Sequence, residues 1–165
     1  MMALINHSNV LQFAREICDR TGNRLTETRL HMLQVLMTVN TPMSAYELTD
    51  HYNSLIDQPI MAMSVYRILD FLESIHLVHR LHSINKYVLC HHLEDCHEHQ
   101  PALFIICRTC QHTQQLSLSP GVLDDLSQQA LHAGFKATGS QLELTCLCEK
   151  CQPSFTQQTN GTYHD

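Results

Sequence analysis

Two short cysteine motifs are the feature of this sequence with the clearest chemistry. Cys107 and Cys110 form one CxxC pair, Cys148 and Cys151 form the other, and each pair follows a segment with the apolar pattern of a strand. A two-residue spacer lets both thiolates of a pair reach one ion at about 2.3 Å, and two such pairs complete a closed tetrahedral zinc shell. Cys146 could replace Cys148 by position, but only Cys148 forms a CxxC pair with Cys151, so we leave Cys146 as a buried thiol. The sequence therefore predicts a structural zinc ion, with unmetallated core cysteines as the alternative.

A second metal site is predicted from a β-hairpin in the middle of the chain. Residues 77–90 read as two extended segments around a short turn. If Ile84 and Asn85 are the loop residues, His79 lies directly opposite Cys90, with Cβ atoms about 4.5 to 5.5 Å apart. One imidazole and one thiolate would then be placed to share an ion, although chance proximity of unmetallated side chains stays as the alternative.

The same predicted register turns this pair toward the second half of the protein. Leu81 and Val88 share its face of the hairpin, and apolar side chains at these positions favour an inward orientation. His97 and His99, in the linker that follows, are the nearest candidates to complete the metal shell. An ion held in this way would tie the hairpin to the other half of the chain.

The elements that must position these residues fall into two groups. Apolar residues recur at helical spacing over 10–18 and 26–39, Ser44 and Glu47 form a capping box that starts a third helix, and a stripe over 65–75 marks a fourth. Followed by the hairpin, this order predicts a winged helix-turn-helix whose fourth helix enters the major groove of DNA.

The second group reads as a small α/β unit, with strands expected at 102–107, 111–118 and 141–145 and a helix between Pro120 and Gly134. We therefore expect an α+β protein. Its predicted parts are a winged-helix DNA-binding domain (1–90), a His-rich hinge (91–101), an α/β zinc-binding domain (102–151) and a flexible tail (152–165).

Composition limits the class of protein. The 165 residues are 44% hydrophobic and 16% charged, which suits one or two small folded domains and excludes a disordered chain. No apolar run approaches the roughly 20 residues of a membrane helix, and no secretory signal pattern is present. We therefore expect a cytoplasmic protein without a membrane partner. In that reducing compartment, its 8 cysteines indicate metal or redox chemistry in place of disulfides.

The net charge of −6 argues at first against a nucleic-acid partner, but it is unevenly distributed. Residues 1–86 carry seven basic and eight acidic side chains, whereas the remainder carries three and eight. A nearly neutral first half can still present a basic face to DNA.

Several segments resemble a known family. They are Arg24-Leu25-Thr26 with Arg29, residues 44–48, 64–70 and 85–90, and the two CxxC pairs. Together they are similar to the ferric uptake regulator superfamily, and the cysteine that ends the hairpin makes the chain most similar to its zinc uptake regulators, Zur. The resemblance implies a homodimeric, metal-dependent repressor with an N-terminal winged helix and a C-terminal dimerisation domain. Such a protein binds double-stranded operator DNA when zinc-loaded, represses zinc-uptake genes and needs no small organic ligand.

The resemblance also implies at least two zinc ions per subunit. Its structural zinc falls on the four cysteines of the CxxC pairs, and its regulatory zinc on His79, Cys90 and His99. The fourth family ligand is a Glu, but this chain has Gln115 there, so the Gln115 oxygen, His97, Glu98 or water must take its place. A third site near the hinge would draw on His91, Glu94, Asp95, His97 and His132, which we leave unassigned.

For DNA contacts, Arg67 on the fourth helix can donate two hydrogen bonds to guanine, unless it pairs with Asp70 or Glu73. Ser64 lies on the same side of that helix. Tyr66 and Tyr46 resemble family residues near the groove, with half-buried packing as the alternative. Arg24 and Arg29 suit phosphate groups.

Three other functions remain open. A zinc hydrolase or deaminase would need an open metal position and a carboxylate. His92-Leu93-Glu94 before a CxxC pair imitates the deaminase signature, but no proline directly precedes Cys107, which disfavours such an enzyme. A peroxide or redox sensor of the same fold would use Cys90 or Cys96. A winged-helix factor with structural zinc alone would hold one ion per chain. Sensing of iron, manganese or nickel is disfavoured because the hairpin thiolate suits zinc.

Overall fold

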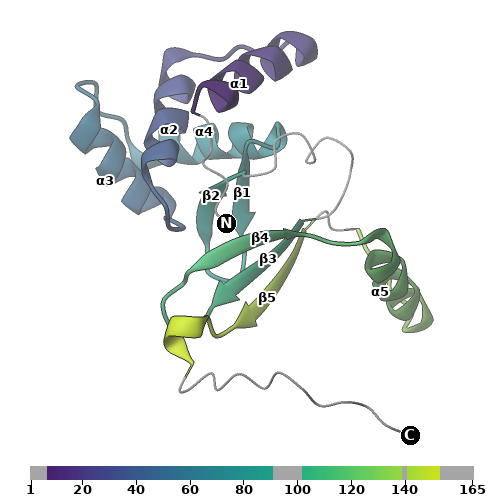
Figure 1. The fold of residues 1–165 in the computed structure, drawn as a ribbon. Coiled ribbons are helices and arrows are strands. Elements are labelled where there is room, and N and C mark those ends of the chain that lie inside the picture. The colour runs from purple at the N-terminus through teal and green to yellow at the C-terminus, as the bar shows by residue number, and fades with distance from the viewer. Residues whose placement is uncertain (1–6, 91–101, 139–140, 153–165) are drawn as a thin grey trace, which may run out of the picture.

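The computed structural model describes residues 7–90, 102–138 and 141–152, which form a helical half and a sheet half (Figure 1). The helical half consists of α1 His7–Thr21, α2 Glu27–Thr38, α3 Ala45–Leu55, α4 Ala62–Ser74, β1 Val78–Leu81 and β2 Lys86–Leu89. The sheet half consists of β3 Ala102–Cys107, β4 Thr113–Ser117, α5 Pro120–His132, β5 Gln141–Cys146 and a 3-10 turn η2 Glu149–Cys151. Within these described ranges, no helix is long and apolar enough to span a bilayer. The predicted α+β class is confirmed, whereas the predicted hinge and nearly all of the predicted tail lie outside the described residues.

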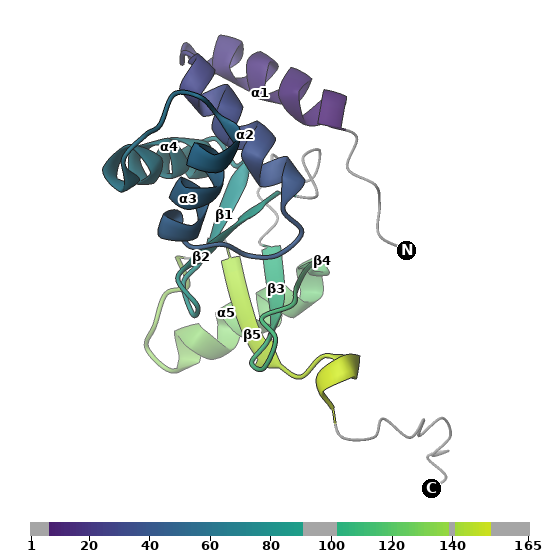
Figure 2. The same cartoon turned by 90° about the vertical axis from the view of Figure 1, so that its left-hand side faces the viewer.

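Helix α4 forms the centre of the helical half because its apolar stripe is continuous. Val65, Leu69 and Leu72 recur at helical spacing, and each is 0% exposed. Residues of α1, α2, α3 and one face of the hairpin join them in a single core. Figure 2 shows the hairpin between these helices and the three-stranded sheet. The predicted order of four helices and a closing hairpin is therefore confirmed.

The start of α3 is set by the predicted capping box. The Ser44 side chain accepts from the Glu47 backbone N–H at 3.2 Å, and the Ser44 N–H donates to the Glu47 carboxylate at 2.6 Å. The other carboxylate oxygen of Glu47 lies 3.3 Å from Lys86 Nζ at the start of β2. The capping box and this ion pair together fix the first turn of α3 against the hairpin.

The three-stranded sheet has the order β4-β3-β5, with β3 antiparallel to β4 and parallel to β5. Its register places Phe104 beside Gln115 on one side and Glu143 on the other, so these three residues form a row across one face. Phe104 and Ile106 on this face pack with Leu81 of the hairpin. This contact joins the two halves of the molecule.

The hairpin register differs from the prediction. His79 pairs with Val88, and the ladder closes at Leu81 and Lys86, so four residues form the loop in place of the expected two. Asn85 adopts a left-handed backbone with a φ of 50°, a conformation that Asn tolerates better than most residues. Since the shift is two positions, His79 and Cys90 keep the same face, but they are diagonal neighbours and not directly opposed.

A carboxylate from the sheet holds the longer loop. The backbone N–H groups of His82 and Ser83 donate to the two carboxylate oxygens of Glu143 at 2.7 and 2.9 Å. Gln141 Nε2 also donates to the Arg80 carbonyl at 2.8 Å. Because the loop amides point to β5, they cannot extend the ladder between β1 and β2.

Candidate metal centre and nucleic-acid interface

The two CxxC pairs meet at one end of the sheet. Cys107 ends β3, Cys110 lies in the following turn, Cys148 directly precedes the η2 turn, and Cys151 is the last residue of that turn. Their four sulfur atoms all lie within 4.8 Å of one another, and Cys110 Sγ is 3.6 Å from Cys148 Sγ. Four sulfurs held tetrahedrally at about 2.3 Å from one ion are about 3.8 Å apart, so the cluster fits zinc.

Cys146 lies outside this cluster, in agreement with the choice of Cys148 as the ligand. Its register partner is Cys107, and its Sγ points to the Ile106 carbonyl at 3.6 Å. It was expected to be buried, but it is half-buried, because β5 is an edge strand with no neighbour on its outer side in the described chain. Sequence spacing therefore identified the four clustered sulfurs correctly.

The electrostatics of the cluster favour a cation. Backbone hydrogen bonds from Cys110 and Cys148 lower the pKa of Cys107 to about 6. The backbone nitrogen of Cys148 lies 3.4 Å from the Cys107 Sγ. Hydrogen bonds with the sulfurs of Cys148 and Cys110 raise the pKa of Cys151 to about 12. One thiolate therefore forms readily, whereas four in such a small volume need the positive charge of a metal ion.

The predicted second site lies where the hairpin faces the sheet. The His79 ring is 4.9 Å from the Phe104 ring, and Gln115 lies beside Phe104 on the same sheet face. Cys90 is 0% exposed and shares the His79 face of the hairpin; its N–H donates to the Leu77 carbonyl at 2.9 Å. The structure therefore brings His79, Cys90 and Gln115 to one interface, whereas the predicted direct opposition of His79 and Cys90 is wrong.

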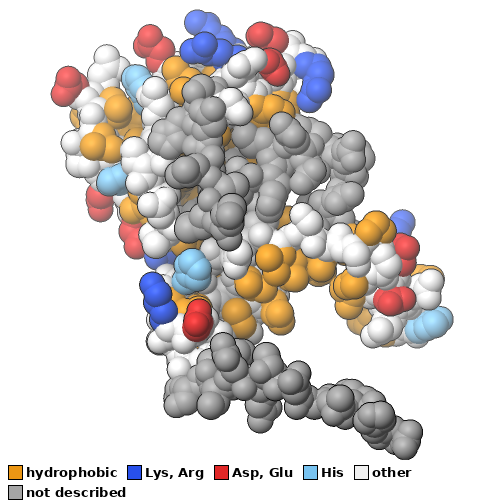
Figure 3. All heavy atoms as spheres, in the orientation of Figure 1, with side chains coloured by type: hydrophobic (Ala, Val, Ile, Leu, Met, Phe, Trp, Pro, Cys, Tyr) orange, Lys and Arg blue, Asp and Glu red, His pale blue; other side chains and the backbone are white. Residues whose placement is uncertain are grey.

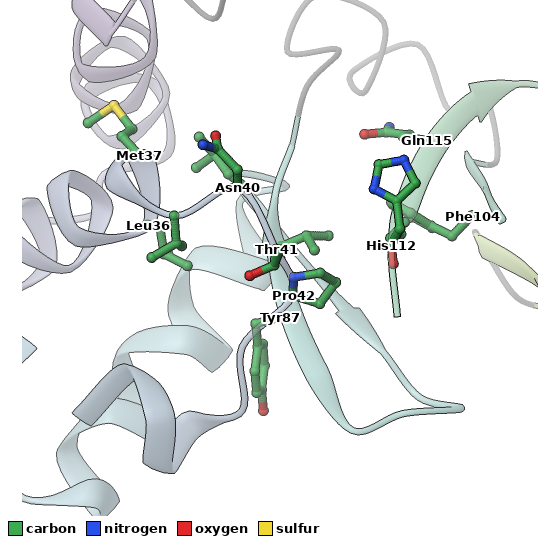
Figure 4. A pocket seen from close by; sticks show the side chains of 13 residues that line it. Leu36, Met37, Asn40, Thr41, Pro42, Tyr87, Phe104, His112 and Gln115 are labelled. Carbon is green, nitrogen blue, oxygen red and sulfur yellow. The ribbon is translucent and has the colours of Figure 1, made fainter. Parts of the chain in front are cut away.

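A cavity of about 80 Å³ opens next to this interface. Its walls come from the segment between α2 and α3, from β2, and from the region of β4. Figure 4 shows Gln115 and His112 on one side of the cavity, across from Asn40 and Thr41. The sequence did not single out this wall, because nothing in the local pattern around residues 40–42 indicates a contact with β4.

The remaining predicted metal ligands have different outcomes. His97, His99 and Glu98 lie outside the described residues, as do His91, Glu94 and Asp95 of the suggested third site. His132 ends α5 and is exposed. Sequence reasoning also gave no role to Glu143, because a single Glu in an alternating strand looks like an ordinary solvent-facing residue.

Four of the six predicted DNA-binding residues lie in the first turn of α3 and the first two turns of α4. Tyr46 is 66% exposed and meets Tyr66 edge-to-face, with ring centroids 6.2 Å apart. Ser64 and Arg67 are exposed, and in the described part of the chain no ion pair joins Arg67 to an acidic residue. Half-buried packing therefore applies to Tyr66 and not to Tyr46.

The two arginines assigned to phosphate differ in their surroundings. Arg24 is exposed at the end of the turn before α2. Arg29 donates to the Arg24 carbonyl at 2.6 Å, and its guanidinium lies 3.4 Å from the centroid of the Phe71 ring. Arg29 therefore also holds α2 against α4, a structural contact that the sequence did not reveal.

Comparisons with known proteins agree with this geometry. Residues 20–145 match the family model of the ferric uptake regulator family. The zinc uptake regulation protein of Escherichia coli (strain K12) is 35% identical over 142 residues, which cover 86% of this chain and 81% of that protein. A solved zinc uptake regulator complexed with zinc and DNA shares 31% identity and has a TM-score of 0.74, covering 88% of this chain and 95% of that one. The holo form of a regulator named XcZur shares 32% identity and has a TM-score of 0.72, covering 88% and 97%.

The relatives are named as regulators and not as enzymes, as the sequence predicted. Their likeness extends through both halves of the molecule, from the helices that carry Tyr46 and Arg67 to the sheet that carries the first CxxC pair. The chain belongs to the ferric uptake regulator family.

Proposed function

We propose that this protein is a zinc-responsive transcriptional repressor that binds operator DNA as a homodimer and controls zinc-uptake genes in the cytoplasm. The observation that carries the proposal is the contact of the His79 face of the hairpin with the Phe104 row of the sheet. This contact joins the DNA-reading helices to the part of the chain that holds the cysteine cluster. A metal-dependent change at this contact would therefore alter the position of the reading helices.

We assign two zinc ions to each chain. The four cysteines of the CxxC pairs hold the structural ion, and His79 and Cys90 hold the regulatory ion with His97, His99 or Gln115. A bound zinc ion supplies positive charge and a fixed ligand geometry between the hairpin and the sheet. Gln115 offers a neutral amide oxygen, a weaker zinc ligand than a carboxylate, so we expect the regulatory site to release zinc more easily than the cysteine cluster.

DNA recognition is assigned to the first turn of α3 and the first two turns of α4. Arg67 donates to a guanine edge, the exposed Ser64 lies one turn before it, and the exposed Tyr46 contacts the half-buried Tyr66. Arg24 and Arg29 supply phosphate contacts. The absence of acidic residues from the first turn of α4 supports this assignment, because a carboxylate there would repel phosphate groups.

The homodimer is assigned to the sheet face opposite the hairpin and to α5. That sheet face carries Leu142, Leu144 and Leu116, which are 38%, 54% and 37% exposed. Figure 3 shows hydrophobic atoms on α5 and on the nearby sheet, with open space between them. No residue of α5 is buried, although Val122 and Leu126 form an apolar stripe. A second copy that covers these surfaces would remove them from water.

The deciding experiment measures zinc per chain and zinc-dependent DNA binding for the intact protein, Cys90→Ser and Cys146→Ser. We expect two zinc ions in the intact protein and in the Cys146→Ser control, but one in Cys90→Ser, which should lose zinc-dependent binding. One zinc in all three proteins would instead support a factor with structural zinc alone. DNA binding by the loaded protein that is abolished by peroxide and restored by thiol would support a redox sensor.

A further inference from the structure

The beginning of α4 carries two methionines that the core does not use. Met61 is 80% exposed and Met63 is 66% exposed, and Met61 is the most exposed large hydrophobic residue in the described part of the chain. Methionine at such positions loses its usual role of filling core gaps. The exposed leucines of the sheet and the apolar stripe of α5 are assigned to the proposed dimer, but these two methionines lie in the other half of the molecule.

Their position on α4 is close to the residues assigned to DNA. Met61 is the N-cap residue of α4, and its side chain makes no cap hydrogen bond. Met63 lies one turn before Arg67, and residues four apart on a helix have Cβ atoms about 5 to 6 Å apart. Residues near the N-terminus of a recognition helix are the ones that contact base edges in a helix-turn-helix protein. The two thioethers therefore extend the same surface that presents Arg67 and Ser64.

The major groove contains one apolar group that matches such side chains. Thymine presents a C5-methyl group there, and apolar side chains distinguish thymine from other bases by contact with this methyl. A methionine side chain is unbranched and flexible, so it can reach a methyl group whose position varies by an ångström or more. We infer that Met61 and Met63 read thymine methyl groups next to the base contacted by Arg67; this inference rests on the proposed function.

The test removes one methyl group at a time from the DNA. Duplexes are first selected from a random-sequence library with the zinc-loaded protein, and each thymine of the selected site is then replaced singly by deoxyuridine. Affinity is measured by fluorescence anisotropy at constant salt and zinc. Loss of one buried methyl group lowers affinity about fourfold. We expect one or two thymines near the Arg67 contact to show this loss, and other thymines to show none.

The protein variants assign the effect to the methionines. Met63→Ala and Met61→Ala should each bind the thymine duplex more weakly and become insensitive to deoxyuridine at one of those positions. Leu55→Ala is the matched control, because Leu55 is 55% exposed at the far end of α3 and should leave the deoxyuridine response unchanged. Since these side chains are exposed, the three variants are expected to fold normally.

The outcomes separate this inference from the proposed function. If no duplex is enriched in the presence of zinc, the proposed function fails and the inference fails with it. If duplexes bind but no deoxyuridine substitution weakens the intact protein, or if both methionine variants keep the full response, the inference alone is overturned. If the methionine variants change oligomeric state but keep the deoxyuridine response, the inference is overturned, and the two methionines are assigned to a contact between protein copies.

Discussion

The contact between Glu143 and the hairpin loop predicts that this one carboxylate stabilises the docking of the hairpin, and of the helices packed on it, against the sheet. The perturbation is Glu143→Ala, which removes the acceptor for the N–H groups of His82 and Ser83, at 2.7 and 2.9 Å in the intact protein. It also removes the partner that Gln141 Nε2 contacts at 2.8 Å. No side chain of the core is lost, so the overall fold should persist.

The magnitude follows from the two backbone hydrogen bonds. Hydrogen bonds to charged groups contribute about 1.5 to 3 kcal/mol each, but this site is partly open to solvent, so we take about 1 kcal/mol for each. The loop should then separate from the sheet about 30 times more often in the variant. Because the closed arrangement is less populated, Glu143→Ala should also need more zinc to reach half-maximal DNA binding.

Hydrogen exchange measured by mass spectrometry or NMR tests this directly. The amides of His82 and Ser83 should lose most of their protection in Glu143→Ala, whereas the Cys90 amide, which donates to Leu77, should not change. Glu16→Ala is the matched control, because Glu16 is an exposed carboxylate on α1 at the other end of the molecule (Figure 1). Equal exchange of the two loop amides in the intact protein and in Glu143→Ala would refute the reasoning, as would equal effects of both substitutions.

Three further predictions concern the regulatory site, the dimer and pH. Gln115→Glu should raise the zinc affinity of the regulatory site several-fold in a chelator competition, because a carboxylate is a better zinc ligand than an amide. The control Gln114→Glu, at a neighbouring exposed position, should leave the zinc affinity unchanged. An equal gain in both variants would argue against Gln115 as a ligand. Leu126→Asp should weaken the dimer in sedimentation experiments, because it places a charge on the apolar stripe of α5. The control Gln128→Asp should leave the dimer intact. A dimer unaffected by Leu126→Asp would place the interface elsewhere. Hydrogen bonds from the capping box lower the pKa of Glu47 below its ordinary 4.5, so its stabilising effect is present above that pH and is lost as the pH falls through the folded-state value. Thermal unfolding of the intact protein should therefore depend more steeply on pH below 4.5 than that of Glu47→Gln, and parallel curves would contradict this.

Much of the architecture could be predicted because its causes are local. The α4 helix follows from Val65, Leu69 and Leu72 at helical spacing, and the start of α3 follows from Ser44 and Glu47, which are three residues apart. Each of these signals depends on side chains within one or two turns, so it survives without knowledge of the rest of the chain. The CxxC pairs belong to the same class, because thiolate spacing alone limits which sulfurs can share an ion.

Other features were decided only by the tertiary structure. The four-residue hairpin loop is held against the sheet by Glu143, 60 positions from Ser83 in the sequence, which accepts hydrogen bonds from the loop amides. The sequence placed His79 and Cys90 on one face, which is correct, but their diagonal relation follows from the register of the folded hairpin, which pairs His79 with Val88. The apolar stripe of α5 predicted a helix correctly, yet nothing local indicated that it would stay uncovered within a single chain. Local patterns determine which helices and strands form. The register between strands and the burial of an apolar helix face depend on partners that only the folded chain brings together.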